Sequence, residues 1–381
     1  MIYLDHAATS WAKPPEVLAA MKFFLERAGG NPGRSGHRLS IDAGRIVYKT
    51  RETLAELFNA RDPLRVIFTS NATHALNLAI SGLLRSGDHV ITSGIEHNAV
   101  MRPLRFLESN GVRVSVVPCD SCGLHDPRDF ARAVEKSTRL IVITHSCNVM
   151  GTILPIAEIS DVARRAGAYL LVDAAQSAGA VPIDMQAMGI DLLAFTGHKG
   201  LQGPTGTGGL ILGERVCADD LEPLTRGGTG SRSESELQPD DLPDKFESGT
   251  LNGMGIAGLE AGARFVMERG IESIRAHEIS LVKKLTEGLG NIPSVRLYGT
   301  NDWEKRSAVV SFTSDRLSTS EIGFRLDEEF DIMCRVGLHC APAAHRAIGS
   351  FPGGTVRFAP GQQTGMSEID AAITAVEHIL R

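Results

Sequence analysis

The sequence lacks long hydrophobic runs. None of its apolar stretches approaches the roughly 18 residues that a helix needs to span a bilayer, although the chain has 381 residues. The first residues, Met1 to His6, also lack the basic segment followed by an apolar segment that marks a secretory signal. These two absences argue against a membrane partner, and we therefore expect a protein of the cytoplasm.

Cysteine is sparse as well. Six cysteines in a chain of this length do not make a disulfide framework, and a reducing compartment would keep them as thiols. Cys119 and Cys122, with His125 nearby, suggest a metal or redox site, but no second motif of this kind completes four zinc ligands. Proline, aspartate, serine and glycine surround the two cysteines, which is typical of a turn. We therefore expect no metal site.

The chain also lacks a large excess of charge of one sign. Its 39 basic and 45 acidic residues give a net charge of -6 and an isoelectric point near 6.1, which argues against nucleic acid as a partner. Single hydrophobic cores stop growing at roughly 250–300 residues, so a chain of this length is expected to form two domains.

Apolar runs and amphipathic segments alternate in the first part of the chain. Strands are expected at 66–69, 89–92, 113–117, 140–144 and 208–212, and two more at the starts of Tyr169–Gln176 and Leu192–Gly200. Helices are expected at 14–28, about 40–58, 74–84, after His97, near 127–134 and near 156–166. This alternation predicts an α/β fold with a mostly parallel, doubly wound sheet.

The second part of the chain has a different pattern. Residues 226–244 are polar and acidic with two prolines, and we expect a long surface loop there. After a helix at 251–267 and another beyond about 270, strands are expected at 295–298, 308–312 and 355–358 and helices at 320–330 and 367–380. We predict an N-terminal segment (1–14) packing with the small domain, a large domain (15–254) and a smaller α+β C-terminal domain (255–381).

Polar residues follow the two buried strands at 169 and 192. The first strand leads to Asp173 and Gln176, and the second leads to Thr196, His198 and Lys199. Ligands of open α/β sheets bind beyond the carboxyl ends of the strands. An acid, an amide and a lysine at two such strand ends could bind a pyridine ring that carries an aldehyde. The pattern therefore predicts a site for pyridoxal phosphate (PLP).

Each of these residues has an ordinary alternative. Lys199 could bind the cofactor covalently and move a substrate proton, or it could be a surface lysine. Asp173 could keep the ring nitrogen protonated, or it could cap a helix. Gln176 would reach the ring hydroxyl. The combination, rather than any one residue, favours the cofactor.

Two further stretches could complete the cofactor site. Ser70 to Thr73 lie at a strand-to-helix junction, where free N–H groups, including those of Ala72 and Thr73, could bind a phosphate with help from Thr196 and His198. His97 follows a strand and could stack on the cofactor ring. The alternatives are simple helix capping for the first stretch and a solvent-facing loop for His97.

A second centre lies near the C-terminus. Cys340 follows Gly337-Leu-His339 close to Arg335, and it could be a reactive thiolate. The alternative is a small, buried apolar residue, which is the usual state of a free cysteine. Arg357 could bind a substrate carboxylate with two hydrogen bonds, or it could form a surface salt bridge.

Taken together, these motifs resemble the class V, fold-type I PLP enzymes, and within them the cysteine desulfurases and selenocysteine lyases. The resemblance runs from the segment Tyr3–Thr9 to Arg357. Its cofactor motifs are Ser70–Asn77, Glu96–His97, Asp173–Gln176 and Thr196–Gly206. In Ser146–Thr152, the resemblance implies that Asn148 faces the substrate. In Phe246–Asn252, it implies that Thr250 reaches the phosphate of the neighbouring subunit in a homodimer with shared active sites.

The segment Arg335–Cys340 resembles the group II nucleophile motif of this family, and plain class V aminotransferases lack that cysteine. Two departures stand out. Leu338 lies where group II enzymes commonly have a second histidine, and the continuation after Cys340 differs, with His345 as an unassigned base. These departures concern the choice between cysteine and selenocysteine and the sulfur acceptor more than the reaction class.

The implied reaction converts L-cysteine to L-alanine and leaves a persulfide on Cys340. Lys199 and His97 would move protons, while Arg335 and Arg357 would bind the substrate. His339, His345 or Arg335 would tune the thiolate, and a sulfur-acceptor protein is a possible partner. The alternatives are a selenocysteine lyase, an aminotransferase or a β-lyase with a structural Cys340. A non-catalytic sulfur carrier or metal-binding protein that uses Cys119, Cys122 and Cys340 is a further alternative.

Overall fold

The computed structural model describes residues 1–33 and 35–381. Its largest sheet has seven strands in the order β2-β8-β7-β6-β5-β3-β4, with β8 antiparallel to its two neighbours and the other strands parallel to one another. The strands are β2 (Val66–Thr69), β3 (His89–Ser93), β4 (Arg113–Val117), β5 (Thr138–Thr144), β6 (Tyr169–Asp173), β7 (Leu192–Thr196) and β8 (Gly208–Leu212). The predicted α/β fold with a mostly parallel sheet is confirmed.

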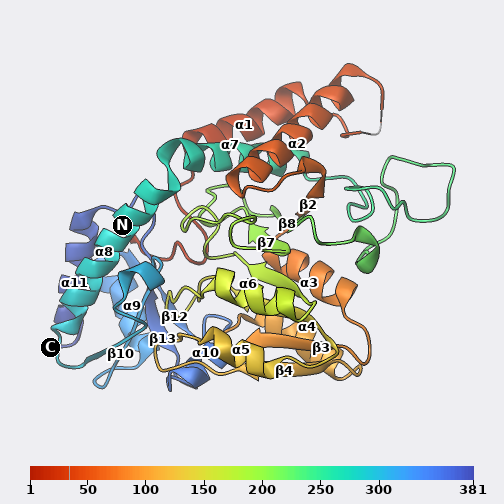
Figure 1. Cartoon of the computed structure of the whole chain (residues 1–381). Coiled ribbons are helices and arrows are strands. Elements are labelled where there is room, and N and C mark those ends of the chain that lie inside the picture. The colour runs from red at the N-terminus through yellow and green to blue at the C-terminus, as the bar shows by residue number, and fades with distance from the viewer. Residues whose placement is uncertain (34) are drawn as a thin grey trace.

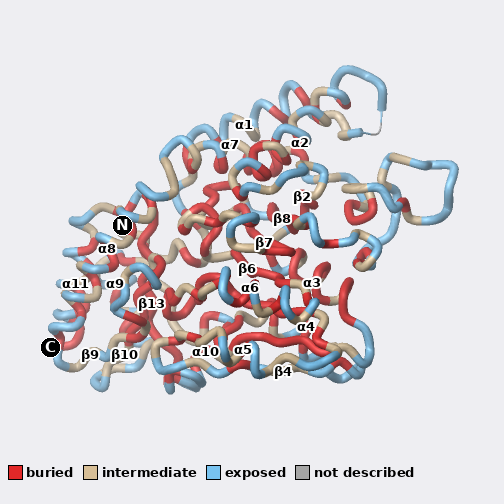
Figure 2. Tube along the Cα trace, in the orientation of Figure 1, coloured by how far each residue is buried: buried red, intermediate tan, exposed pale blue. Residues whose placement is uncertain are grey.

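Both faces of this sheet are buried, which explains its continuous apolar strands. Within β5, Ile141 packs into one hydrophobic cluster and its neighbours Leu140 and Val142 pack into another. Figure 2 shows that the buried parts of the chain concentrate along these central strands. The covering helices include α3 (Ala72–Leu83), α4 (Asn98–Glu108), α5 (Pro127–Ala133) and α6 (Ile156–Arg165).

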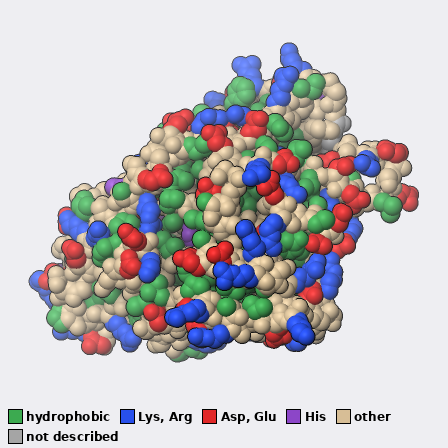
Figure 3. All heavy atoms as spheres, viewed as in Figure 1, with side chains coloured by type: hydrophobic (Ala, Val, Ile, Leu, Met, Phe, Trp, Pro, Cys, Tyr) green, Lys and Arg blue, Asp and Glu red, His purple; other side chains and the backbone are tan. Residues whose placement is uncertain are grey.

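Three helices pack together at one end of the molecule (Figure 1). They are α1 (Pro15–Arg27), α2 (Arg38–Leu57) and α7 (Gly253–Arg269). Close to them, residues 226–244 form a largely exposed loop that projects from the body, as the sequence predicts. Over the face drawn in Figure 3, basic and acidic side chains are interleaved.

A second, antiparallel sheet of four strands has the order β12-β13-β10-β9. Its strands are β9 (Val295–Tyr298), β10 (Val310–Ser314), β12 (Arg335–Gly337) and β13 (Thr355–Phe358), and the nearby helices are α8 (Ile271–Gly290), α9 (Thr319–Phe330), α10 (Pro342–Ala347) and α11 (Met366–Ile379). Short 3-10 turns lie at Pro63–Arg65, Ala218–Asp220 and Trp303–Lys305. The boundaries proposed at residues 14 and 254 stay a prediction.

The structure corrects some element boundaries. The strand expected at 308–312 is displaced to Val310–Ser314, and α10, directly after Cys340, was not expected. Helix α3 begins two residues before the predicted His74, because the side chain of Asn71 caps it by accepting a hydrogen bond from the His74 N–H. Among the helices of the described residues, none is long and apolar enough to cross a membrane.

The N-terminal segment links the two sheets. Strand β1 (Ile2–Tyr3) pairs in parallel with β11 (Ile332–Met333), and Asp5 forms a bridge with Ala359 directly after β13. Only a few residues later, the Ser10 N–H donates to the carbonyl oxygen of His198. The first ten residues therefore run from the separate two-stranded β1–β11 sheet, past the end of β13, to the loop that carries Lys199.

Candidate active site

A pocket of about 480 Å³ lies beyond the carboxyl ends of β5, β6 and β7, which is the size of a site for a small ligand. It is lined by Asn71, Ala72, Thr73, His97, Ala99, Thr144, Ser146, Asn148, Asp173, Ala175, Gln176, Thr196, His198 and Lys199. Most of the predicted cofactor residues thus come together in one place. Four predicted residues are not part of this lining, namely Thr250, Arg335, Cys340 and Arg357.

Lys199 follows β7 in a loop that returns to the antiparallel strand β8. Two backbone hydrogen bonds close this loop, from Gly197 N–H to Thr207 O and from Gln202 N–H to Lys199 O. Burial lowers the pKa of Lys199 to about 8, Arg357 and Arg335 act in the same direction, and Asp173 opposes them. A larger share of the amine is therefore neutral near pH 7, which is the form that can act as a nucleophile or base.

Asp173 ends β6 and is buried. Its Oδ1 accepts a hydrogen bond of 2.9 Å from the Ala175 N–H. This contact closes a turn, and no helix lies between β6 and β7 in the described chain, so the helix-capping alternative is wrong. Burial raises the pKa of Asp173, and the hydrogen bond from Ala175 and the charge of Lys199 offset only part of this effect. A protonated pyridine nitrogen would supply a cationic donor to the Asp173 carboxylate.

Gln176 lines the same pocket, and its Nε2 donates to the carbonyl oxygen of Ala7 at 3.0 Å.

The opposite end of the pocket suits a phosphate. Ala72 and Thr73 lie in the first turn of α3, where backbone N–H groups have no partner within the helix. A Cβ at Gly208 would come within 2.7 Å of the Asn71 Cα, so glycine lets β8 pass close to this turn. Within the described chain, the buried Nδ1 of His198 has no hydrogen-bond partner. The acid at one end and these donors at the other fit PLP.

His97 caps α4, and its Nδ1 accepts a hydrogen bond of 3.0 Å from the Ala99 N–H. The proton of the neutral ring therefore resides on Nε2. Burial, followed by the charges of Lys199 and Arg335, lowers the pKa of His97 to about 4. The alternative of a solvent-facing histidine is wrong, because this side chain is half-buried and lines the pocket.

Glu96, directly before His97, has a structural role that the sequence motif alone did not suggest. Its fully buried carboxyl accepts hydrogen bonds from the Ser93 hydroxyl and, at 2.9 Å, from the Thr144 N–H. Burial raises the pKa of Glu96 to about 8. Glu96 thus joins the ends of β3 and β5 and fixes the start of α4.

Cys340 is exposed, so the alternative of a small buried residue is wrong. Its backbone φ is +57°, and that of His339 is +48°; both are uncommon for non-glycine residues. Two contacts hold this turn against the large sheet, from Asn98 N–H to Cys340 O at 2.8 Å and from Asn148 Nδ2 to His339 O at 2.7 Å. Cys340, His97 and Thr73 line an open groove of about 1090 Å³ that adjoins the pocket.

Three residues were expected to tune the Cys340 thiol, and they differ in position. Arg335 Nη2 donates to Cys340 Sγ at 3.8 Å. His339 and His345 are buried, with hydrogen bonds to the hydroxyls of Thr355 and Ser350. Burial lowers their pKa values to about 2 and about 4. In the described structure, Arg335 is the one of the three with a polar contact to the sulfur.

Arg357 is almost fully buried on β13, so the alternative of a surface salt bridge is wrong. Its Nη2 donates to Asp5 Oδ1 at 2.6 Å, and its Nη1 donates to the carbonyl oxygen of Asn148 at 3.1 Å. Within the described residues, its buried Nε has no hydrogen-bond partner. The sequence did not indicate Asp5 as a partner, because the two residues meet only through the N-terminal segment.

The remaining candidates lie elsewhere. Thr250 is exposed and 3.4 Å from Asn31 Nδ2, outside the pocket of its own chain, and its role toward a neighbouring subunit stays a prediction. Asp120 accepts hydrogen bonds from the N–H groups of Cys122 and Leu124, which is a turn. The described residues contain no group of three or more histidine, cysteine or acidic side chains that could hold a metal ion.

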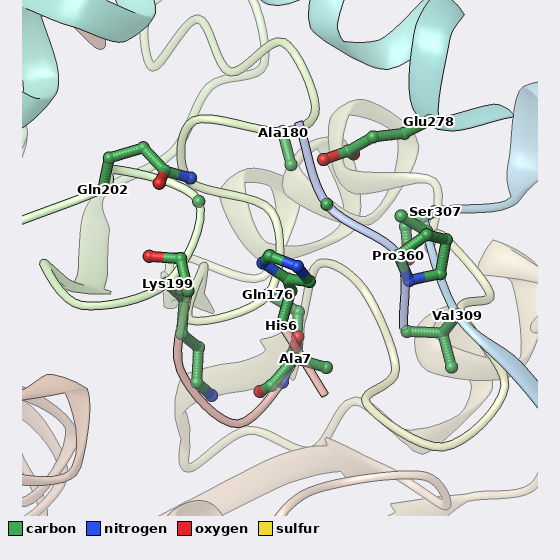
Figure 4. Close-up of a pocket in the computed structure, with 14 residues that line it drawn as sticks. His6, Ala7, Gln176, Ala180, Lys199, Gln202, Glu278, Ser307, Val309 and Pro360 are labelled. Carbon is green, nitrogen blue, oxygen red and sulfur yellow. The ribbon is translucent and has the colours of Figure 1, made fainter. Parts of the chain in front are cut away.

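A second cavity of about 440 Å³ lies on the other side of the Lys199 loop (Figure 4). His6, Gln176, Gln202, Glu278 and Ser307 are among the residues that line it. Glu278, from α8, is buried, and burial raises its pKa to about 8. Figure 4 shows that the Lys199 side chain runs away from Gln202 and Glu278. This cavity could not be foreseen from the sequence alone.

Comparisons with known proteins agree with this geometry. The family description "Aminotransferase class-V" matches residues 2–371. A probable cysteine desulfurase of Methanothermobacter thermautotrophicus is 37% identical over 93% of this chain and 89% of its own length. One from Synechocystis is 32% identical over 100% and 91%, respectively. Among solved structures, the apo cysteine desulfurase of Thermococcus onnurineus is similar with a TM-score of 0.93 at 33% identity, covering 100% of this chain and 94% of the other.

Proposed function

Because the chain belongs to the class V aminotransferase family, and within it to the cysteine desulfurases, we infer that it converts L-cysteine to L-alanine and transfers the sulfur to Cys340. One observation carries this assignment to Cys340. The thiol is exposed, contacts Arg335, and lies in a groove that adjoins the pocket with Lys199 and Asp173. An aminotransferase would have no use for a thiol in that position.

The cofactor of this family, PLP, supplies an electron sink for the substrate Cα when it is bound. Lys199 would bind it covalently, and Asp173 would keep a proton on its ring nitrogen. His97 would lie against the ring and Gln176 near its hydroxyl. Ala72, Thr73, Thr196 and His198 would hold its phosphate, with Thr250 of the neighbouring subunit.

The substrate would be held and deprotonated by residues of both sheets. The carboxylate of L-cysteine would accept hydrogen bonds from Arg357, whose Nε has no partner among the described residues. Asn148 and Arg335 would lie beside it. The neutral amine of Lys199 would remove the Cα proton, and Lys199 or His97 would return a proton later. The depressed pKa of each of these two bases enlarges its neutral fraction, which is the form that can accept a proton.

Cys340 would then act on the substrate sulfur. Its thiolate attacks that sulfur, an S–S bond forms, and the electrons of the broken C–S bond remain on the substrate Cβ. Protonation of that carbon completes alanine. Cysteine and a thiol thus give alanine and a persulfide, so the step needs no external oxidant or reductant.

The test is Cys340→Ser, with the exposed Cys217→Ser as the matched control. We expect alanine release from L-cysteine to fall by at least about 10²-fold in Cys340→Ser, while the visible absorbance of the bound cofactor stays. Cys217→Ser should behave like the native protein. Full activity of Cys340→Ser would contradict the persulfide step. Running L-cysteine, D-cysteine and L-selenocysteine side by side identifies the preferred substrate.

The proposed partners follow from the same surfaces. The open groove beside Cys340 leaves room for a thiol of a sulfur-acceptor protein to approach the persulfide. The exposed position of Thr250 is compatible with a homodimer in which it reaches the neighbouring site. The cytoplasm is the compartment that we propose, because free thiols persist there.

A further inference from the structure

The carbonyl oxygen of His198, in the peptide that leads into Lys199, accepts an unusual number of hydrogen bonds. All of them come from the N-terminal segment. The donors are the Ser10 N–H at 2.9 Å, the Ser10 hydroxyl at 3.1 Å, the Thr9 hydroxyl at 3.1 Å and the Lys13 ammonium at 2.8 Å. A carbonyl oxygen has two lone pairs, so this oxygen has more donors than lone pairs.

Lys13 is the unexpected member of this group. It is half-buried, its Nζ also donates to the Ser10 hydroxyl at 2.6 Å, and burial lowers its pKa to about 8. In the part of the chain that the structure describes, no carboxylate forms an ion pair with Lys13. Removing an ammonium from water without an opposite charge is costly. Despite this cost, the folded chain holds the Lys13 ammonium within hydrogen-bond distance of the His198 carbonyl oxygen.

We propose that Lys13 is a positioning residue for Lys199, because its ammonium fixes the peptide from which the Lys199 side chain extends. This peptide lies beyond the end of β7, where strand pairing no longer holds it. The Gln202 N–H holds the far side of Lys199, and Lys13 holds the near side by a charge-assisted hydrogen bond. The inference rests on the proposed role of Lys199.

A purely structural role for Lys13 would be to fasten the N-terminal segment to the large sheet. That segment has other attachments on the same side, namely the hydrogen bonds of Thr9 and Ser10 to the His198 carbonyl oxygen and the hydrogen bond from Gln176 to the Ala7 carbonyl oxygen. Removal of the Lys13 ammonium should therefore disturb the Lys199 peptide more than the fold.

The test uses the holoenzyme with Lys13→Met, which keeps the length of the side chain and removes its donor. We expect kcat to fall by about 10- to 100-fold, because small misplacements of a reacting group cost that much, and KM to change by less than about twofold. Visible absorbance should be retained, but the visible circular dichroism per bound cofactor should change, since it reports cofactor orientation. Lys13→Arg should restore part of both signals.

The matched control is Lys22→Met, at an exposed lysine of α1, which should change none of these signals. If Lys13→Met does not fold, Thr9→Val removes a neutral donor from the same oxygen, and a smaller change in the same direction is expected. Native kcat and native circular dichroism in the tested variant would overturn this inference and leave the proposed function intact. A loss of activity that follows only cofactor content or unfolding temperature would overturn it too. A native protein without alanine release would overturn the proposed function and this inference with it.

Discussion

The lysine end and the cysteine end of the site are built in different ways. Lys199 lies in a short loop between two paired strands of the large sheet, and residues of the N-terminal segment hold the peptide before it. Cys340 follows the three-residue strand β12 at the edge of the smaller sheet, is exposed, and lies in a turn with positive φ angles. The Lys199 loop is therefore enclosed on several sides, whereas the Cys340 turn is held by a few hydrogen bonds.

This difference matches the chemistry that we propose for each end. A group that removes a proton from carbon must keep its position relative to the cofactor, so a rigid and partly dry surrounding is favourable. A cysteine that receives sulfur and passes it on must reach both the pocket and the outside. His339 and Cys340 have positive φ angles, and Cys340 is exposed and lines the groove that adjoins the pocket.

The largest effect is expected from Lys199→Ala, which removes the amine at the lysine end of the site. This change should lower alanine release by about 10⁴-fold or more and abolish the visible absorbance, because no other residue of the lining carries an amine. An absorbance spectrum and an alanine assay check it, with Lys22→Ala as a control at an exposed position. If the variant kept a cofactor band that borohydride reduces onto the protein, Lys199 would not be the attachment site.

A smaller effect is expected at the cysteine end from Arg335→Gln. The loss of a charged donor to the sulfur should cost about 1.5–3 kcal/mol, so alanine release and alkylation of Cys340 by iodoacetamide should slow by about 10- to 100-fold. Cofactor absorbance should be unchanged. Arg346→Gln, at an exposed arginine of α10, is the control. Equal alkylation rates in both variants would show that Arg335 does not act on the thiol.

The smallest effect concerns Glu278 in the cavity behind the lysine end. Its pKa is raised from 4.5 to about 8, so between these values the unfolded chain loses a proton that the folded chain keeps. The free energy of unfolding therefore decreases as the pH rises through this window. Glu278→Gln should remove this decrease, which stabilises the protein at pH 8 by about 1–3 kcal/mol and has little effect near pH 4.5.

Thermal unfolding of both proteins at the two pH values measures this difference. Glu26→Gln, at an exposed glutamate, serves as the control and should unfold like the native protein at either pH. Identical pH dependence in Glu278→Gln and the native protein would mean that the Glu278 carboxyl ionises normally in the folded state.

The sequence was sufficient to predict the local parts of this site. Continuous apolar runs ending in Asp173 and Lys199 identify two neighbouring strand ends, because burial on both faces leaves a clear pattern. Parts that depend on distant contacts were not predictable in the same way. The ion pair of Arg357 with Asp5 depends on the route of the N-terminal segment, and the enclosure of Glu278 depends on how α8 packs against the Lys199 loop.

The hairpin of β7 and β8 also has a consequence for the order of folding. Thr196 and Thr207, which bracket the Lys199 loop, are 11 residues apart in the chain, whereas Asn148 and His339, which seat the cysteine turn, are 191 residues apart. Short loops close at a smaller entropic cost than long ones, and local contacts form faster. During synthesis or refolding, the chain can therefore complete the Lys199 loop long before it brings Cys340 into place.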